Sequence, residues 1–126
     1  MSYLNANDIT SNLAQGFDLT PYLEESDNEI NDLAERLGVR DSDDIQTPLH
    51  FKIKRYGIEY VLTRLCEDKS GTNNPDSVEM DKYFALAEYH RRRANELQAM
   101  ISVEMVTGDV NEIRDRAVRS GSIFRG

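Results

Sequence analysis

The chain has 126 residues, of which 39% are apolar and 30% are charged, and its net charge is −8. This length and composition fit one globular domain with a single core. No segment approaches the roughly 20 consecutive apolar residues of a membrane-spanning helix, and the first residues lack the basic and apolar regions of a signal peptide. A protein dedicated to nucleic-acid binding would be basic, so the acidic balance argues against that class.

The charge is unevenly distributed along the chain. Residues 1–49 hold eleven acidic residues and two arginines, and residues 50–106 hold nine residues of each sign. Residues 107–126 hold four arginines and three acidic residues. This asymmetry suggests that the acidic front of one copy could meet the basic tail or the Lys/Arg cluster of another.

Two helices are predicted before Gly38. The first is short, covers about Asn5–Leu13 and is capped by asparagine side chains. The second covers about Thr20–Leu37, and it is either continuous from its Thr-Pro start or restarted at the capping box that opens at Ser26. Gly38 is expected to end it. Its apolar stripe is Ile30, Leu33, Ala34 and Leu37.

The third predicted helix is expected to be the most buried. A second Thr-Pro signal opens it at Thr47, and it runs to about Asp68. Between Ile53 and Cys66 apolar side chains occupy most of its faces, as in a central helix. Gly57 would cost this helix about 1 kcal/mol relative to alanine. We interpret that glycine as a sign that a neighbouring helix approaches closely there.

A polar loop at Lys69–Pro75 precedes the longest predicted helix. A capping box at Asp76 opens that helix, which runs to about Val106 and would be on the order of 45 Å long. Its apolar stripe is Met80, Tyr83, Phe84, Ala87, Ala94, Leu97, Ile101 and Met105. One core does not need a helix of this length, so we expect its far end to project or to pack against a neighbouring subunit. A further capping box predicts a short fifth helix at Asp109–Val118.

These elements predict an all-α fold, a small antiparallel bundle of four main helices plus the short fifth. The bundle domain covers residues 1–107, and residues 108–126 form an extended C-terminal docking tail. In this tail Ile123 and Phe124 stand between Arg119 and Arg125. A terminus with apolar anchors but too little length to fold on itself usually frays. We therefore expect another chain to cover it, as in an assembly component and not an enzyme.

Signals for catalysis, metal binding or a cofactor are poor. The only histidines are His50 and His90, and the sequence holds no zinc-ligand spacing or Gly-rich phosphate loop. His90 falls on the apolar stripe of the long helix, which favours a hydrogen-bonded histidine at the core edge. His50 is interpreted as a neutral residue in the first turn of the third helix. The acidic turn Asp41–Asp44 lacks the glycine and the bidentate glutamate of a calcium loop. We predict no catalytic, cofactor or metal site.

The single cysteine, Cys66, is interpreted as a buried, reduced thiol. It cannot form an internal disulfide, which favours a cytosolic protein or one assembled in a cytosol. A nucleophilic cysteine needs an adjacent base and an electropositive setting. The neighbouring Glu67 and Asp68 would instead raise the pKa of the thiol, so core packing is the preferred interpretation.

Two basic clusters are candidate contacts between subunits. The first consists of Lys52, Lys54 and Arg55, in the first two turns of the third helix, where the helix dipole disfavours cations. We expect a compensating acidic surface nearby, supplied either by the second helix or by a partner. The second cluster contains Arg92 and Arg93, which are expected to face solvent.

The run His90–Arg93 has three interpretations. Consecutive helical residues point about 100° apart, so its arginines do not form one patch. Glu88 and Glu96 have the spacing to pair with Arg92. The run can be an ordinary solvated face, a set of inter-subunit salt bridges or a nucleic-acid contact, in that order of preference.

The order of these helices resembles that of the head-completion or adaptor proteins in the head–tail connector of long-tailed bacteriophages. The resemblance is carried by the segment DLTPYLEESDNEINDLAERLGV, by the buried helix with Tyr56 and Tyr60, and by the YFALAEYHRRRANEL pattern of the long helix. It covers roughly residues 2–107. Residues 109–126 stand where the C-terminal tail of these proteins would be.

This resemblance implies a structural virion protein of the neck, assembled in the host cytoplasm. It implies a homo-oligomeric ring of twelve copies under the portal, whose tails reach into the portal, with a downstream neck or tail protein as a second partner. DNA would pass through the channel without specific binding, because a negative lumen repels phosphates. No membrane and no cofactor are implied. The alternative is a cytosolic helical regulatory or protein-binding module that uses the third helix to hold a partner peptide.

Overall fold

The computed structural model describes residues 3–71 and 77–108, and every regular element in these ranges is helical. The α-helices are α1 (Thr20–Arg36), α2 (Phe51–Gly71), α3 (Ser77–Met100) and α4 (Val103–Thr107). Single 3-10 turns are η1 (Ala6–Asp8), η2 (Asn12–Ala14) and η3 (Ser42–Asp44). The prediction of a small all-α bundle is confirmed. The predicted fifth helix and the tail lie outside the described residues.

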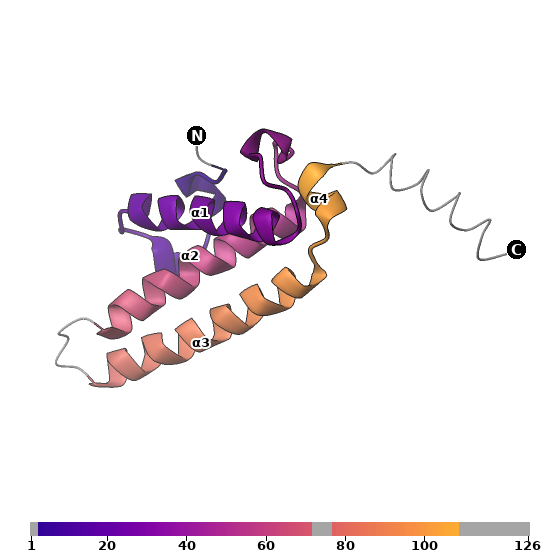
Figure 1. Ribbon diagram of the computed structural model, residues 1–126. Coiled ribbons are helices and arrows are strands. Elements are labelled where there is room, and N and C mark those ends of the chain that lie inside the picture. The colour runs from indigo at the N-terminus through magenta and orange to yellow at the C-terminus, as the bar shows by residue number, and fades with distance from the viewer. Residues whose placement is uncertain (1–2, 72–76, 109–126) are drawn as a thin grey trace, which may run out of the picture.

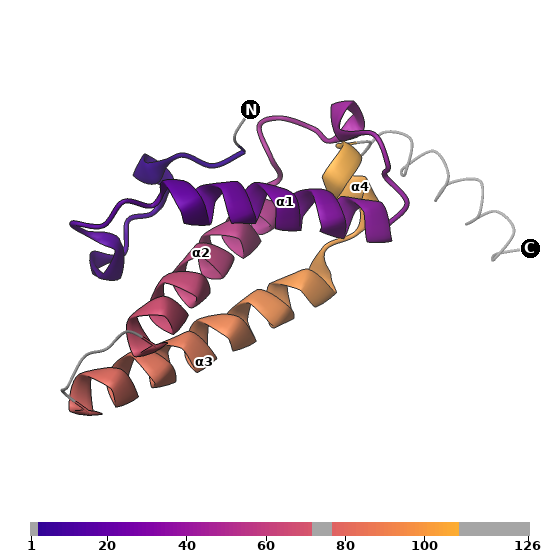
Figure 2. The same cartoon turned by 60° about the vertical axis from the view of Figure 1, so that its left-hand side comes forward.

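The helix α2 lies at the centre of the arrangement. It forms an antiparallel hairpin with α3, and α1 lies across it (Figure 1). The turned view shows α3 running alongside α2 while α1 crosses it obliquely (Figure 2). The short α4 lies at the end of the hairpin where α2 begins.

The core consists of two clusters that share α2. The larger one joins all four α-helices and contains Ile30, Leu33, Ala34, Val39, Ile45, Ile53, Tyr56, Ala94, Ile101 and Val106. The smaller one joins α2 to the N-terminal segment and contains Ile9, Ala14, Leu19, Val61, Leu62 and Leu65. Because α2 has neighbours on several sides, its apolar residues occupy most of its faces. This confirms the prediction that the third helix is the central one.

The prediction of a continuous first helix is wrong. The segment forms two single 3-10 turns separated by extended residues. The Asn5 side chain accepts a hydrogen bond from the Asn7 N–H (2.9 Å), and the Asn5 N–H donates to Asp8 (2.9 Å). Ser11 caps the second turn in the same way. These side-chain bonds to nearby backbone groups compete with a continuous helix and leave only one turn at each cap.

The second helix is continuous, and Ser26 does not restart it. Ser26 is fully buried, and its hydroxyl donates a hydrogen bond to the Leu23 carbonyl at 2.8 Å. Gly38 follows the end of α1 with a φ of 97°, a value that favours glycine. The Val39 N–H then donates to the Ala34 carbonyl at 2.8 Å, as in a Schellman ending. The prediction that Gly38 ends this helix is confirmed.

The start of α2 lies later than predicted. The helix begins at Phe51 instead of Thr47, and His50 precedes it instead of lying in its first turn. The Lys52 N–H donates a hydrogen bond to Nδ1 of His50 at 3.2 Å. The His50 side chain therefore serves as the cap at this end.

The close approach predicted at Gly57 is confirmed. A Cβ atom added at this position would lie 2.6 Å from Cδ1 of Leu4 and 3.2 Å from Cδ1 of Ile30. Glycine thus lets α1 and the N-terminal segment pack directly against the backbone of α2.

The longest helix is shorter than predicted, and its far end does not project. It ends at Met100, and the chain turns back through Ser102 into α4. Ile101 and Val106 are buried, and the Val106 carbonyl accepts a hydrogen bond from the Gln46 N–H at 2.8 Å. Turning back places both apolar side chains in the common core, whereas a straight helix would carry them away from it.

The apolar stripe predicted for this helix is correct in part. Ala87 and Ala94 are buried, but Phe84 is 62% exposed. Among the described elements α3 packs mainly against α2, so its buried face is narrow and Phe84 lies outside it. The side chain of Met80 lies outside the described part of the chain.

Removing residues 109–126 is expected to change the melting temperature by only a few degrees. Both core clusters are formed within residues 3–108, and a loss of about 1 kcal/mol shifts a domain of this size by roughly 3–6 °C. Thermal unfolding followed by circular dichroism measures the difference. A fall of more than about 15 °C would mean that the tail belongs to the core.

Candidate functional site

One face of α2 forms a groove with the N-terminal segment, here called the α2 groove. Its α2 residues follow helical spacing along a single face. The groove has a volume of about 390 Å³ and is lined by Asp8, Thr10, Ser11, Phe51, Lys54, Arg55, Ile58, Glu59 and Leu62. It therefore combines apolar side chains with two cations of the predicted basic cluster.

Within the chain, the acid that pairs with this cluster does not come from the second helix, and an acidic surface on a partner stays a prediction. Lys54 Nζ lies 3.0 Å from Oδ1 of Asp8, in the N-terminal segment instead of the second helix. The hydrogen bond from the Asn5 N–H, followed by the one from Lys54, lowers the pKa of Asp8 below its ordinary value. Asp8 thus stays ionised and holds the N-terminal segment against α2.

Arg55 is the exposed cation of the α2 groove. Within residues 3–71 and 77–108 it makes no ion pair. Lys52 is half-buried on the same helix and does not line the groove. The structure therefore brings Lys54 and Arg55 together and leaves Lys52 beside them. Whether they contact another subunit stays a prediction.

Phe51 is an apolar component of the α2 groove that the sequence analysis did not identify. Its side chain is 67% exposed, and its ring stacks on the His50 ring with 4.7 Å between centroids. The i, i+4, i+7 spacing of Phe51, Arg55 and Ile58 could have indicated this face. The prediction placed the start of the apolar pattern at Ile53 and overlooked it.

The buried carboxylate of Glu59 lies at the base of the groove. Glu59 is 7% exposed, and its Oε2 atom lies 2.6 Å from Nδ1 of His90 on α3. Arg93 donates to the other carboxylate oxygen from Nε at 3.2 Å. A buried carboxylate is costly unless it is paired and hydrogen-bonded, and here it is both. Glu59 is the one acidic residue between Ile53 and Cys66, the most apolar stretch of the sequence, and that pattern could have indicated this buried site.

The interpretation of His90 as a hydrogen-bonded histidine at the core edge is confirmed. It is 8% exposed and pairs with Glu59. Arg93 was expected to face solvent; its side chain is 37% exposed, and it also reaches across the helix pair to Glu59. The guanidinium of Arg93 also lies 5.8 Å from the centroid of the Tyr89 ring.

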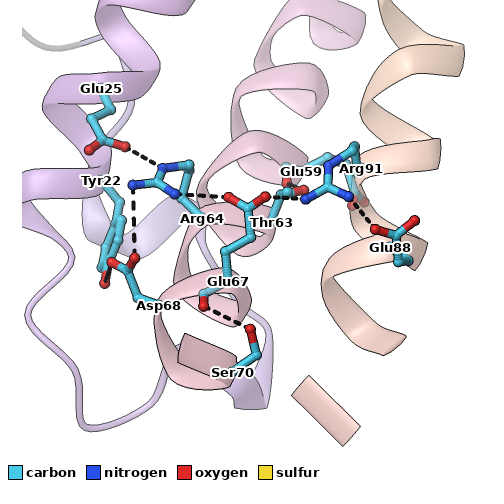
Figure 3. Close-up of polar contacts among 10 residues, drawn as sticks. All are labelled: Tyr22, Glu25, Glu59, Thr63, Arg64, Glu67, Asp68, Ser70, Glu88 and Arg91. Atoms are coloured by element: carbon cyan, nitrogen blue, oxygen red, sulfur yellow. Dashed lines mark hydrogen bonds and ion pairs between the residues drawn. The ribbon is translucent and has the colours of Figure 1, made fainter. Parts of the chain in front are cut away.

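The predicted pairing of Arg92 with Glu88 and Glu96 is also wrong. Glu88 pairs with Arg91, which pairs in turn with Glu67 on α2 (Figure 3). Arg92 is exposed and has no ion pair in the described part of the chain. His90, Arg91 and Arg93 of the run each pair with a glutamate of α2, whereas Arg92 lies on the solvent side of α3.

A ladder of charged side chains connects the three long helices. Arg64 of α2 donates to Glu25 of α1 at 2.9 Å and to Glu67 at 2.8 Å, and Glu67 continues to Arg91 and Glu88 of α3 (Figure 3). These side chains are partly exposed, and such pairs typically contribute only about 0–1 kcal/mol each. Since every group in the ladder has a partner within the chain, we assign it a structural role.

Cys66 lies in the core. Burial raises the pKa of its thiol, and the positive charge of Lys69 partly opposes that rise. The predicted cause, repulsion from the adjacent acids, is therefore not the main one.

The described residues hold no group of three or more His, Cys, Asp or Glu side chains placed to bind a metal ion. In the same ranges, no helix has the length and apolar character needed to cross a membrane.

The tail residues predicted to dock on a partner, Arg119, Ile123, Phe124 and Arg125, lie outside the described residues. Their role stays a prediction.

Comparison of the chain with protein-family models, with curated proteins and with solved structures gave no match.

Proposed function

We propose that this chain is a structural assembly protein, an adaptor of the head–tail connector in a long-tailed bacteriophage that links the portal to the neck and tail. Copies of the chain would form a ring around the DNA channel, with the portal on one side and a downstream neck or tail protein on the other. DNA would pass through without specific binding. The proposal includes no catalytic step and no cofactor.

The α2 groove is the observation that carries this proposal. It presents an exposed phenylalanine beside an arginine that lacks an acidic partner in the described part of the chain. Exposed aromatic and arginine side chains at a concave surface are typical of the residues that dominate the energy of protein–protein contacts. The side chains of Phe51 and Arg55 therefore suit the groove to hold another protein.

Two further features support an adaptor over a general binding protein. The helical bundle is the fold expected for this class from the resemblance of residues 2–107. The net charge of −8 suits a ring that DNA traverses, since a negative lumen repels the phosphate backbone.

Negative-stain electron microscopy of the chain mixed with the portal protein encoded next to it tests the proposal. The expected result is a ring of added density on one face of the portal, absent when the chain is left out. A single chain bound at a one-to-one ratio to a partner, with no ring, would favour the alternative of a cytosolic helical binding module. That alternative is compatible with the same groove, which could hold one partner peptide.

Reversing the two groove cations is expected to impair assembly more than folding. In the variant with Lys54→Glu and Arg55→Glu, the ion pair with Asp8 is lost, but exposed pairs contribute only about 0–1 kcal/mol each. Ring formation on the portal, scored at low ionic strength where such charges act most strongly, should fall sharply. Lys82→Glu is the matched control, because Lys82 is also an exposed helical cation but lies outside the groove and belongs to neither basic cluster. Normal ring formation by the groove variant would contradict this prediction.

A further inference from the structure

We propose that the α2 groove receives the acidic turn η3 of a second copy of this chain, so that Asp43 and Asp44 of one copy contact Arg55 and Lys54 of the next. This inference rests on the proposed assembly role and names the occupant of the groove. Its basis is that Arg55, Asp43 and Asp44 make no ion pair within the described part of the chain.

The groove has a positive charge that the chain itself does not neutralise. Asp8 lies against Lys54, and Glu59 at the base is already shared by His90 and Arg93. Arg55 remains exposed at the groove wall with no ion pair in the described ranges. An incoming carboxylate would therefore meet a guanidinium without displacing an existing pair, which is the arrangement that favours a complementary contact.

The turn η3 carries the complementary negative charge. Asp43 and Asp44 are exposed, and neither makes an ion pair within the part of the chain that the structure describes. Asp41 is occupied differently, because its side chain accepts the Asp43 N–H at 3.0 Å and shapes the turn. The turn thus presents two adjacent exposed carboxylates that have no ion pair in the described ranges, which suits them to the unpaired guanidinium of Arg55.

The acidic turn is anchored to the core of its own chain. Ile45, directly after η3, is buried in the larger core cluster, and the Gln46 N–H is bound to the Val106 carbonyl at 2.8 Å. The groove wall is fixed separately by the pair of Lys54 with Asp8. With both surfaces held in place, the contact would form between two copies of the chain.

The contact joins two different surfaces of the same chain. Such a head-to-tail interface repeats from copy to copy and closes into a ring when the rotation between copies permits. Each contact is expected to be weak by itself, because it consists mainly of exposed charges. Several contacts in a closed assembly would act together through effective concentration.

Carbodiimide cross-linking of the chain alone tests this proposal without the portal. Isotopically heavy and light copies are mixed at high protein concentration and low ionic strength, and the reagent joins lysine amines directly to carboxylates. We expect heavy–light peptides that connect Lys54 to Asp43 or Asp44. The link between Lys54 and Asp8 is the internal control, because it should form within one copy. If that control link forms but no heavy–light link from Lys54 to the turn is found, the proposal is overturned.

Charge exchange gives a second, independent measurement by sedimentation velocity. Arg55→Glu should weaken self-association by about tenfold relative to the Lys82→Glu control. Replacing both Asp43 and Asp44 by lysine should have a similar effect, and combining these changes with Arg55→Glu in one chain should restore association in part. Equal association of the Arg55→Glu and Lys82→Glu variants, or no recovery in the combined chain, would contradict the contact. Portal rings that still form with these variants would leave the proposed function standing and remove only this inference.

Discussion

Ile53→Ala is expected to lower the free energy of unfolding by about 2–5 kcal/mol, the usual cost of truncating a buried isoleucine. Ile53 is 1% exposed and lies in the larger core cluster between α1 and α3. At roughly 3–6 °C for each kcal/mol, the melting temperature should fall by about 6–30 °C. Denaturant unfolding followed by circular dichroism measures the change directly.

Phe51→Ala is the matched control for that substitution, since it removes a larger side chain only two residues earlier in α2. Because Phe51 is 67% exposed, the unfolding free energy should change by no more than about 0.5 kcal/mol. Its effect should appear instead in ring formation on the portal. A large loss of stability in Phe51→Ala, or a small one in Ile53→Ala, would mean that the first turn of α2 is packed differently.

The double substitution Ile123→Ser with Phe124→Ser is expected to abolish joining of the chain to the portal while leaving a folded, soluble protein. Full burial of these two side chains against a partner would contribute about 3–6 kcal/mol, reduced by the cost of ordering a chain terminus. Several tails in one ring would add their contributions through effective concentration. Pull-down on the portal and negative-stain imaging provide the measurement.

A tail with alternating side chains could bind in a groove of the partner or add a strand to a sheet edge. Substituting Arg119 and Arg125 by alanine separates the contribution of charge from that of the apolar pair. If the variant with both serines assembles at the wild-type yield, the tail is not the anchor. The helical body, with the α2 groove, would then make the contact.

Several features of the fold could be predicted from local sequence. The ending of α1 at Gly38 depends on one residue that tolerates a positive φ. The central position of α2 follows from its apolar residues on most faces, and the close approach at Gly57 follows from the absence of a side chain there. Each of these is indicated by a pattern within a few residues, although the side chains that approach Gly57, those of Leu4 and Ile30, come from far earlier in the chain.

The candidate site could be predicted only in part. Lys54 and Arg55 were identified as a cationic cluster, but the partner of Lys54 is Asp8, far earlier in the sequence. Glu59 was not identified, although a lone acid in an apolar helix is a recognisable pattern. Its pairing with His90 depends on the register between α2 and α3, which no local pattern gives.

The sequence by itself determined that the segments of α1, α2 and most of α3 are helical and that α2 is the central helix. The tertiary structure decided the partners of the charges and the path of the chain after Met100. It replaced the predicted pair of Glu88 with Arg92 by the links from Arg91 to Glu67 and Glu88, and it folded α4 back onto the core. The reason is physical: caps and stripes act over one or two helical turns, whereas ion pairs and burial depend on distances that exist only after the helices have packed.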